Sequence, residues 1–231
     1  MPPRMNKSQQ TLEVGGVFCI SLKEREDRRE HLQKEFLPLG LDIEFYLAER
    51  DVDNPERGCY ESHRACAAMA MERGYQRVLI LEDDATLTMP AESVIARINC
   101  FLKIRNPEIF YLGGMLGRMW LIPFAGVVRA KLTGGHAYML SRKGMKKIVD
   151  KPYSKKAVDS FYATEFKAYA VYPLFCDQLP ESDVKSDIAD YRIETKGGGS
   201  YKDGEYWNLN SRKQEVALRR DMWRTLCGRW L

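Results

Sequence analysis

The sequence predicts an α/β sandwich with a mostly parallel central sheet, and two observations support this fold class. Between Val17 and Phe175, short apolar runs rich in β-branched and aromatic residues alternate with amphipathic segments. The run Val78–Leu81 is aliphatic at every position, which is typical of a strand buried on both faces of a parallel sheet. Alternating strands and helices favour a layered α/β domain.

The first half of this domain is predicted to contain three strands and two helices. Val17–Leu22 indicates the first strand, and the charged segment 23–36, with apolar residues four apart, indicates an amphipathic helix. Residues 41–50 alternate like a second strand. Residues 54–75 favour a loop followed by a helix that stops at Gly74, and the aliphatic strand follows.

The second half continues the alternation. The predicted elements are a helix over 91–103, a strand over 109–115, a strand over 136–141, a helix over 142–151 capped by Ser141, and a strand over 168–175. We expect a loose segment over 1–14, one domain over 15–195, and a linker with a basic amphipathic C-terminal helix over 196–231.

Composition limits the classes of function. The 231 residues are 45% hydrophobic and 29% charged, as in an ordinary soluble globular domain. No apolar run approaches the ~20 residues that span a bilayer, the N-terminus lacks the apolar core of a signal peptide, and the six cysteines show no metal-binding spacing. We therefore expect a cytoplasmic protein with reduced thiols.

The net charge of +4 comes from the C-terminal tail. Residues 212–231 carry six basic and two acidic residues, whereas the rest of the chain is balanced, so we expect no nucleic-acid partner. Leu218, Met222, Leu226 and Trp230 fall four apart in this tail. Such a helix either packs on its own domain or makes a peripheral membrane contact.

The main candidate site is the acidic cluster Glu82, Asp83 and Asp84, directly after the aliphatic strand. In α/β folds, ligands bind beyond the carboxyl ends of the strands. Converging carboxylates repel unless a cation lies between them, and Mn²⁺ or Mg²⁺ suits such oxygen ligands and shares its shell with phosphates. The cluster predicts a metal–diphosphate site; the alternative is an acidic loop that caps the next helix.

A second enzyme class has a motif close to the same residues. Haloacid-dehalogenase-like phosphohydrolases carry D-x-D-x-T after an apolar strand, and Glu82-x-Asp84-x-Thr86 resembles this pattern with the wrong first residue. A glutamate in place of the nucleophilic aspartate would misplace the attacking oxygen by roughly 1 Å, which counts against a phosphohydrolase. A non-catalytic protein that only binds a sugar nucleotide is a third alternative.

The segment "RGCYESHRACAAMAMERGYQRVLILEDDATL" resembles the signature block of glycosyltransferase family 25. The matching positions are Gly58, Cys59, Ser62, His63 and the Glu82–Asp84 cluster. Further pieces follow in the order typical of the family, at Asp27–Arg28, Ala137–Tyr138, Ser141, Gly144, Asp159, Gln178 and Ser186–Ile188. The resemblance spans roughly Val17 to Ile188.

This resemblance implies a GT-A-type, Rossmann-like α/β/α fold and an inverting, metal-dependent hexosyltransferase. The donor would be a UDP-sugar, with galactose or glucose the usual hexose of the family. The acceptor hydroxyl would belong to a glycan, a lipid-linked saccharide or a protein, and the family's bacterial members point to lipopolysaccharide biosynthesis. Neither the sugar nor the acceptor is specified by the sequence.

The resemblance also suggests donor-side roles. Asp84 is the first candidate metal ligand, with Asp83 or Glu82 as the second ligand or as a holder of the donor ribose or sugar. Ser21, Leu22 and Arg28 lie where the base and ribose would rest, and Arg28 is alternatively a helix-surface charge. Ser62 and His63 are candidate donor contacts, and His63 is alternatively a helix cap.

An inverting transfer needs a general base, and Asp159 is the candidate. Its alternative role is a helix N-cap, and its rivals as base are Asp177, Asp183 and Asp187. The remaining candidates are Gly134–Gly135 for close backbone approach to a sugar, His136 as an extra metal ligand, and Gln178 and Ser186 as acceptor or phosphate contacts.

Overall fold

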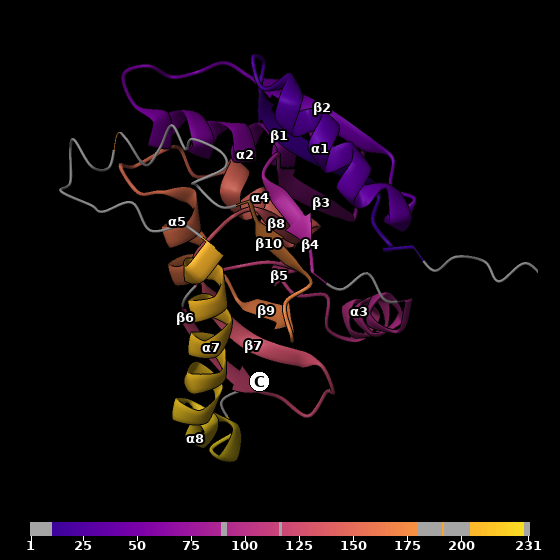
Figure 1. Ribbon diagram of the computed structural model, residues 1–231, viewed down its shortest axis with the longest axis vertical. Coiled ribbons are helices and arrows are strands. Elements are labelled where there is room, and N and C mark those ends of the chain that lie inside the picture. Colours follow the sequence, from indigo (N-terminus) through magenta and orange to yellow (C-terminus); the bar gives the residue numbers. More distant parts are fainter. Residues whose placement is uncertain (1–10, 89–91, 116, 180–190, 192–203, 229–231) are drawn as a thin grey trace, which may run out of the picture.

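The computed structural model describes residues 11–88, 92–115, 117–179, 191 and 204–228 (Figure 1). Several predicted features lie outside the described residues. They are the first ten residues, the candidates Asp183, Ser186 and Asp187, the glycine-rich segment 196–200 and Trp230.

An eight-stranded sheet forms the centre of the molecule (Figure 1). Its order is β2 (Ile43–Ala48), β1 (Gly16–Leu22), β3 (Arg77–Glu82), β8 (Ala137–Ser141), β5 (Ile109–Tyr111), β9 (Ala168–Val171), β7 (Val127–Leu132) and β6 (Gly117–Leu121). The pairings make six strands run one way, with only β8 and β7 reversed. The predicted mostly parallel α/β sheet is confirmed.

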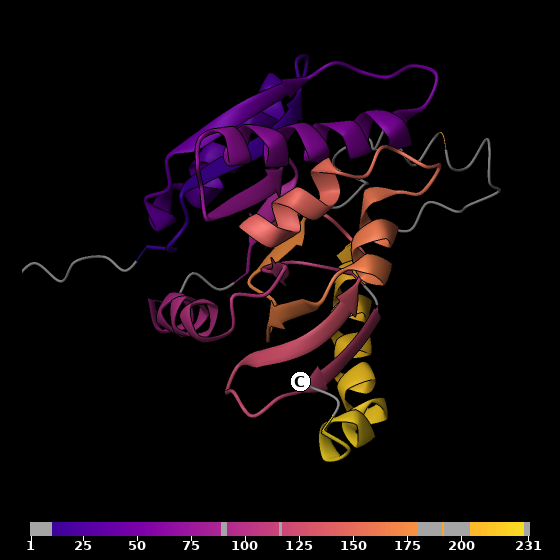
Figure 2. The ribbon, with the colours of Figure 1, turned by 180° about the vertical axis from the view of Figure 1, so that it is seen from behind.

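Helices cover both faces of this sheet. Along β3, Val78 and Ile80 belong to one apolar cluster and Leu79 and Leu81 to another, because successive side chains of a strand point to opposite faces. The first cluster includes residues of α2 (Pro55–Glu72), α4 (Arg142–Val149) and α5 (Val158–Glu165), and the second includes residues of α1 (Glu26–Phe36) and α3 (Glu92–Arg105). Figure 2 shows α2 and α4 in front of the sheet.

Local signals in the sequence account for the ends of α2 and α4. The Asn54 side chain accepts a hydrogen bond from the Arg57 amide at the start of α2, and Gly74 follows its end with a φ of 76°. Ser141 caps α4 by accepting from the Gly144 amide, as predicted. These two ends matter because α2 begins just before the signature residues and α4 continues directly from β8.

Two β structures had no clear signal in the sequence. β6 and β7 form an antiparallel hairpin at the edge of the sheet, and β4 (Ala85–Leu87) pairs with β10 (Cys176–Gln178) in a separate two-stranded sheet. The strands predicted over 109–115 and 168–175 end early, at Tyr111 and Val171. The small sheet places Gln178 beside Glu82 at the end of β3.

The C-terminal helix packs on its own domain, one of the two predicted alternatives. α7 (Gly204–Arg220) contacts β6, and its Asn210 side chain donates to the Gly114 carbonyl oxygen at 3.4 Å. The predicted apolar stripe is wrong beyond Leu218, because α7 ends at Arg220 and the short α8 (Met222–Leu226) leaves Met222 and Leu226 exposed. None of the helices in the described ranges is long and apolar enough to cross a membrane.

Glu108 connects three elements at the end of the sheet opposite the acidic cluster. Its buried carboxylate contacts Lys143 at 2.8 Å and Lys147 at 3.2 Å, both on α4, and accepts from the Lys167 amide just before β9. Burial acts to raise the pKa of Glu108, but these partners outweigh it and lower the pKa to about 2.

We predict that Glu108→Gln removes an acid-sensitive part of the stability. Because the pKa of the folded state lies below the usual value, the ionised carboxylate stabilises the protein at neutral pH, and this contribution is lost as pH falls from about 4.5 toward about 2. Urea unfolding should show a clear deficit for the variant at neutral pH that shrinks in acid. A deficit of equal size at every pH would contradict the assignment; Asp150→Asn, at an exposed pair with Lys146, is the control.

Candidate functional site

The predicted site residues meet at one edge of the sheet. Ile20 of β1 lies beside Glu82 of β3 in the parallel pairing, and Leu81 lies opposite Ala137 at the start of β8. The carboxyl ends of β1 and β3 therefore meet the loop that precedes β8. This edge brings together Ser21, Leu22, Arg28, His63, Glu82, Asp83 and Asp84.

Glu82 is held by a buried chain of hydrogen bonds. Its Oε1 lies 3.2 Å from Nε2 of His63, whose Nδ1 lies 2.7 Å from the Tyr138 hydroxyl. The Tyr138 hydroxyl in turn lies 2.9 Å from that of Tyr162. His63, Tyr138 and Tyr162 have no solvent exposure, so the chain links the site to the interior through α2, β8 and α5.

Asp83 points away from this chain and is neutralised by an arginine. Its Oδ1 accepts from Nη1 of Arg28 at 3.0 Å, and both side chains are nearly buried, at 8% and 12% exposure. Burial raises the pKa of Asp83, and the hydrogen bonds from Ser21 and Arg28 only partly oppose this effect. The alternative that Arg28 is a helix-surface charge is wrong.

The side-chain amide of Gln178 contacts both Asp84 and Glu82. Nε2 of Gln178 donates to Oδ1 of Asp84 at 3.1 Å and lies 3.4 Å from Oε2 of Glu82, while Arg28 lies 3.8 Å from Oδ2 of Asp84. Gln178 reaches this position because β10 pairs with β4, which puts Gln178 opposite Ala85. Two carboxylates thus converge on one side-chain amide.

Ser21 and Leu22 are organised by Arg29, which we did not predict as a site residue. Nη1 of Arg29 donates to the Leu22 carbonyl oxygen at 2.7 Å and to the Ser21 hydroxyl at 3.2 Å. The sequence offers a weak signal for it, since Arg28 and Arg29 are adjacent on α1. Arg29 fixes the end of β1, and Arg28 fixes the acidic cluster.

Ser62 and His63 differ in their relation to this edge. The Ser62 hydroxyl donates to the Gly58 carbonyl oxygen at 2.8 Å, so its hydrogen bond is made within α2. His63 lies inside α2 rather than at its start, where Asn54 is the cap, so the capping alternative for His63 is wrong. His63 reaches the site through Glu82. Direct contact of either residue with a donor stays a prediction.

The loop before β8 packs tightly against Glu82. A Cβ on Gly135 would lie 3.1 Å from Oε1 of Glu82 and 3.5 Å from the His63 ring. Gly134 has a φ of 87°, a conformation that favours glycine. The imidazole of His136 is buried against Gly113, where a Cβ would come within 2.2 Å of Nε2.

Asp159 lies in the first turn of α5, whose N-cap is Ala157, so the predicted N-cap alternative for Asp159 is wrong. Its Oδ1 accepts from the Ser160 amide at 2.6 Å and its Oδ2 from the Gly134 amide at 3.4 Å. Asp159 therefore contacts the same loop that packs on Glu82. The rival Asp177 lies on β10, and burial raises its pKa.

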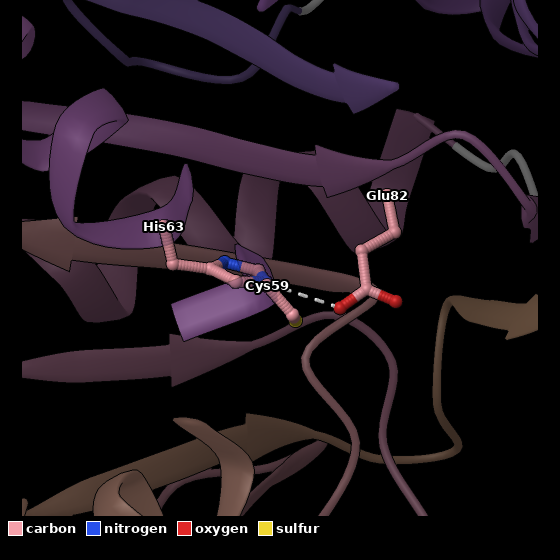
Figure 3. Close-up of side chains that lie close together, drawn as sticks. All are labelled: Cys59, His63 and Glu82. Atoms are coloured by element: carbon pink, nitrogen blue, oxygen red, sulfur yellow. Dashed lines mark hydrogen bonds and ion pairs between the residues drawn. The ribbon is translucent and has the colours of Figure 1, made fainter. Parts of the chain in front are cut away.

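Cys59, His63 and Glu82 form a compact group of ligating side chains (Figure 3). One atom from each, a sulfur, a nitrogen and an oxygen, lies within 4.8 Å of the other two. Cys59 and His63 are one turn apart on α2, and Glu82 ends β3. The sequence prediction did not combine these three, because their proximity depends on how α2 packs on the sheet.

We predict that Tyr138→Phe destabilises the fold by roughly 1–3 kcal/mol, because it removes the hydroxyl partner of a buried imidazole. The free energy of unfolding in urea measures the effect. Tyr162→Phe is the matched control: it removes the last hydroxyl of the chain and leaves the contact between Tyr138 and His63, so its cost should be smaller. A Tyr138→Phe protein as stable as the parent would contradict the role of this chain.

Comparison with solved structures finds remote similarity. A197 from STIV is 15% identical, with a TM-score of 0.47 over 71% of this chain and 84% of that chain. Mannose-1-phosphate geranyltransferase from Thermus thermophilus is 11% identical, with a TM-score of 0.44 over 73% and 76%. A glycosyltransferase involved in glycosylation of the major capsid of PBCV-1 is 9% identical, with a TM-score of 0.35 over 58% and 63%.

The sequence comparisons are more specific. No curated protein sequence matches the chain. The model of glycosyltransferase family 25, described as an LPS biosynthesis protein, matches residues 47–131. This segment runs from the end of β2 to β7 and contains α2 with His63, and β3 with the acidic cluster. The predicted resemblance to glycosyltransferase family 25 is therefore confirmed over the part of the chain that carries Cys59, His63 and the three carboxylates.

Proposed function

We propose that the protein is an inverting, metal-assisted glycosyltransferase of the GT-A type that moves a hexose from a UDP-sugar to an acceptor hydroxyl. The observation that carries this proposal is the arrangement of Glu82, Asp83 and Asp84. They lie together at the carboxyl end of a central strand, within the family-matched segment. Glu82 contacts His63, Asp83 contacts Arg28, and Gln178 contacts both Asp84 and Glu82. Ligands of α/β folds bind at such an edge.

The donor set fits a hard divalent cation. Oε2 of Glu82 and Oδ1 of Asp84 converge on the Gln178 amide, and carboxylate oxygens are the ligands that Mn²⁺ and Mg²⁺ prefer. Asp83, which we predicted as a second metal ligand, is nearly buried and forms an ion pair with Arg28. Glu82 is therefore the better candidate for the second ligand. When bound, the cation would supply charge stabilisation to the leaving diphosphate.

The remaining donor contacts follow from the neighbours of the cluster. Ser21 and Leu22 end the strand beside β3, and we place the base and ribose against this end of the strand. Arg28 lies between Asp83 and Asp84, at 3.0 and 3.8 Å, and brings positive charge to the position proposed for the diphosphate. We assign Arg28 a positioning role for the two aspartates.

Asp159 is the proposed general base. The acceptor oxygen attacks the anomeric carbon, the bond from that carbon to the diphosphate oxygen breaks, and the hydroxyl proton passes to the Asp159 carboxylate. Backbone amides of Ser160 and Gly134 orient this carboxylate, and Gly134 adjoins the glycine that packs on Glu82. The base would thereby be connected to the donor side of the site.

The acceptor is proposed by class only. The description of the matched family refers to lipopolysaccharide biosynthesis, which supports a glycan or a lipid-linked saccharide as the acceptor. A protein hydroxyl is the other candidate acceptor. Exposed Met222 and Leu226 beside basic residues of α7 and α8 would suit a peripheral membrane contact of the kind a lipid-linked acceptor requires.

We predict that UDP binds in the presence of Mn²⁺ and that EDTA or Asp84→Asn weakens this binding at least about tenfold, because either change removes the link between carboxylate and diphosphate. Isothermal titration calorimetry with each protein measures the effect. Asp150→Asn, at an exposed pair just after the last turn of α4, should bind UDP like the parent. Binding that is indifferent to metal and to Asp84 would contradict the metal role, and phosphate release from a simple ester without UDP binding would favour a phosphohydrolase.

We predict that Asp159→Asn lowers turnover of a UDP-hexose roughly 10²–10⁴-fold and leaves UDP affinity unchanged, since a general base acts on the acceptor proton and not on the donor. Turnover is followed by UDP release with acceptor mixtures. Asp177→Asn is the comparison variant, because Asp177 was the rival candidate. If Asp177→Asn shows the large loss and Asp159→Asn does not, the two assignments must be exchanged.

A further inference from the structure

We propose that Cys59, His63 and Glu82 form a second cation site, specific for a zinc-class divalent ion and separate from the donor-site metal. The three side chains present a sulfur, an imidazole nitrogen and a carboxylate oxygen within 4.8 Å of one another (Figure 3). The proposal rests on this geometry alone and does not depend on the proposed glycosyl transfer.

The distance between the imidazole and the carboxylate is that of two neighbouring ligands in tetrahedral coordination. A zinc ion with bonds of about 2.0–2.1 Å to nitrogen and oxygen separates two such ligands by roughly 3.3 Å in a tetrahedron. Nε2 of His63 and Oε1 of Glu82 are 3.2 Å apart. Bonds of about 2.3 Å to sulfur require roughly 3.5 Å between sulfur and the other ligands. The Cys59 sulfur lies within 4.8 Å of both, so it would move closer on binding to supply the third ligand. The fourth position is left for water.

The surroundings of His63 also suit a metal ligand. A metal-bound histidine nearly always donates its other ring nitrogen to a hydrogen-bond partner, which fixes the tautomer and the ring plane. Here Nδ1 of His63 lies 2.7 Å from the Tyr138 hydroxyl, which lies 2.9 Å from the Tyr162 hydroxyl. In the zinc-bound state, Nδ1 would donate to the Tyr138 hydroxyl, and the lone pair of Nε2 would bind the cation in place of its present contact with Glu82.

The chemistry of the three ligands distinguishes this site from the donor site. A thiolate with an imidazole selects zinc-class ions, whereas oxygen-only ligands suit Mn²⁺ and Mg²⁺. The two oxygens of Glu82 face different neighbours: Oε1 faces His63, and Oε2 faces Gln178 and Asp84. Zinc-class binding would use Oε1, release the thiol proton of Cys59 to solvent, and join α2 to the end of β3 through the ion.

Cobalt(II) is the probe, because its bond to a thiolate gives a charge-transfer absorption in the near ultraviolet that oxygen ligands do not give. We expect one equivalent of Co²⁺ to produce this band in the full chain, and Zn²⁺ to displace it. Cys59→Ser should abolish the band. Cys100→Ser and Cys227→Ser, which remove exposed cysteines elsewhere, are matched controls that should keep it.

The result has two outcomes. Loss of the band in Cys59→Ser alone, with a circular dichroism spectrum like that of the parent, supports the site. Absence of the band in the parent chain overturns the proposal, as does a band that persists in Cys59→Ser or disappears in either control. Glu82→Gln is a second variant that keeps the thiol, and it should weaken Co²⁺ binding at least about tenfold, measured by the same titration.

Discussion

Three consecutive carboxylates can occupy the end of one buried strand only if their mutual repulsion is relieved, and the site is built around this constraint. Glu82 contacts His63 of α2, Asp83 contacts Arg28 of α1, and Asp84 contacts Gln178 of β10. Neighbouring side chains of the strand diverge, so the partners come from both faces of the sheet and from the small second sheet. Each partner belongs to a different element.

The fold and the site therefore depend on each other. α2 must pack on the sheet to bring His63 against Glu82, and Tyr138 of β8 and Tyr162 of α5 then fix the imidazole from the interior. The same loop that precedes β8 approaches Glu82 through Gly135 and contacts Asp159 through Gly134. Three hydrogen bonds thereby connect Tyr162, inside the core, to the acidic cluster.

The sequence was sufficient for the layered fold, because periodicity and capping signals are local, and most of the candidate donor-side residues that it indicated lie together at one edge of the sheet. It could not specify the partners of the carboxylates. Arg28 was predicted to lie beside the donor ribose, whereas in the structure it donates a hydrogen bond to Asp83. Arg29, Tyr138 and Tyr162 were not predicted as site residues. These contacts join residues distant in the chain, and β4 and β10 are too short to have a recognisable pattern. The roles of Asp84 and Asp159 stay predictions.

The central claim is that the carboxyl edge beside Glu82 and Asp84 holds the donor. The most direct measurement is a crystal structure grown with UDP and Mn²⁺, with the metal located by its anomalous scattering. The account predicts an anomalous peak in contact with Asp84 and the UDP diphosphate, and a base near Ser21 and Leu22. UDP bound at the opposite end of the strands, or a manganese peak away from Asp84, would contradict it.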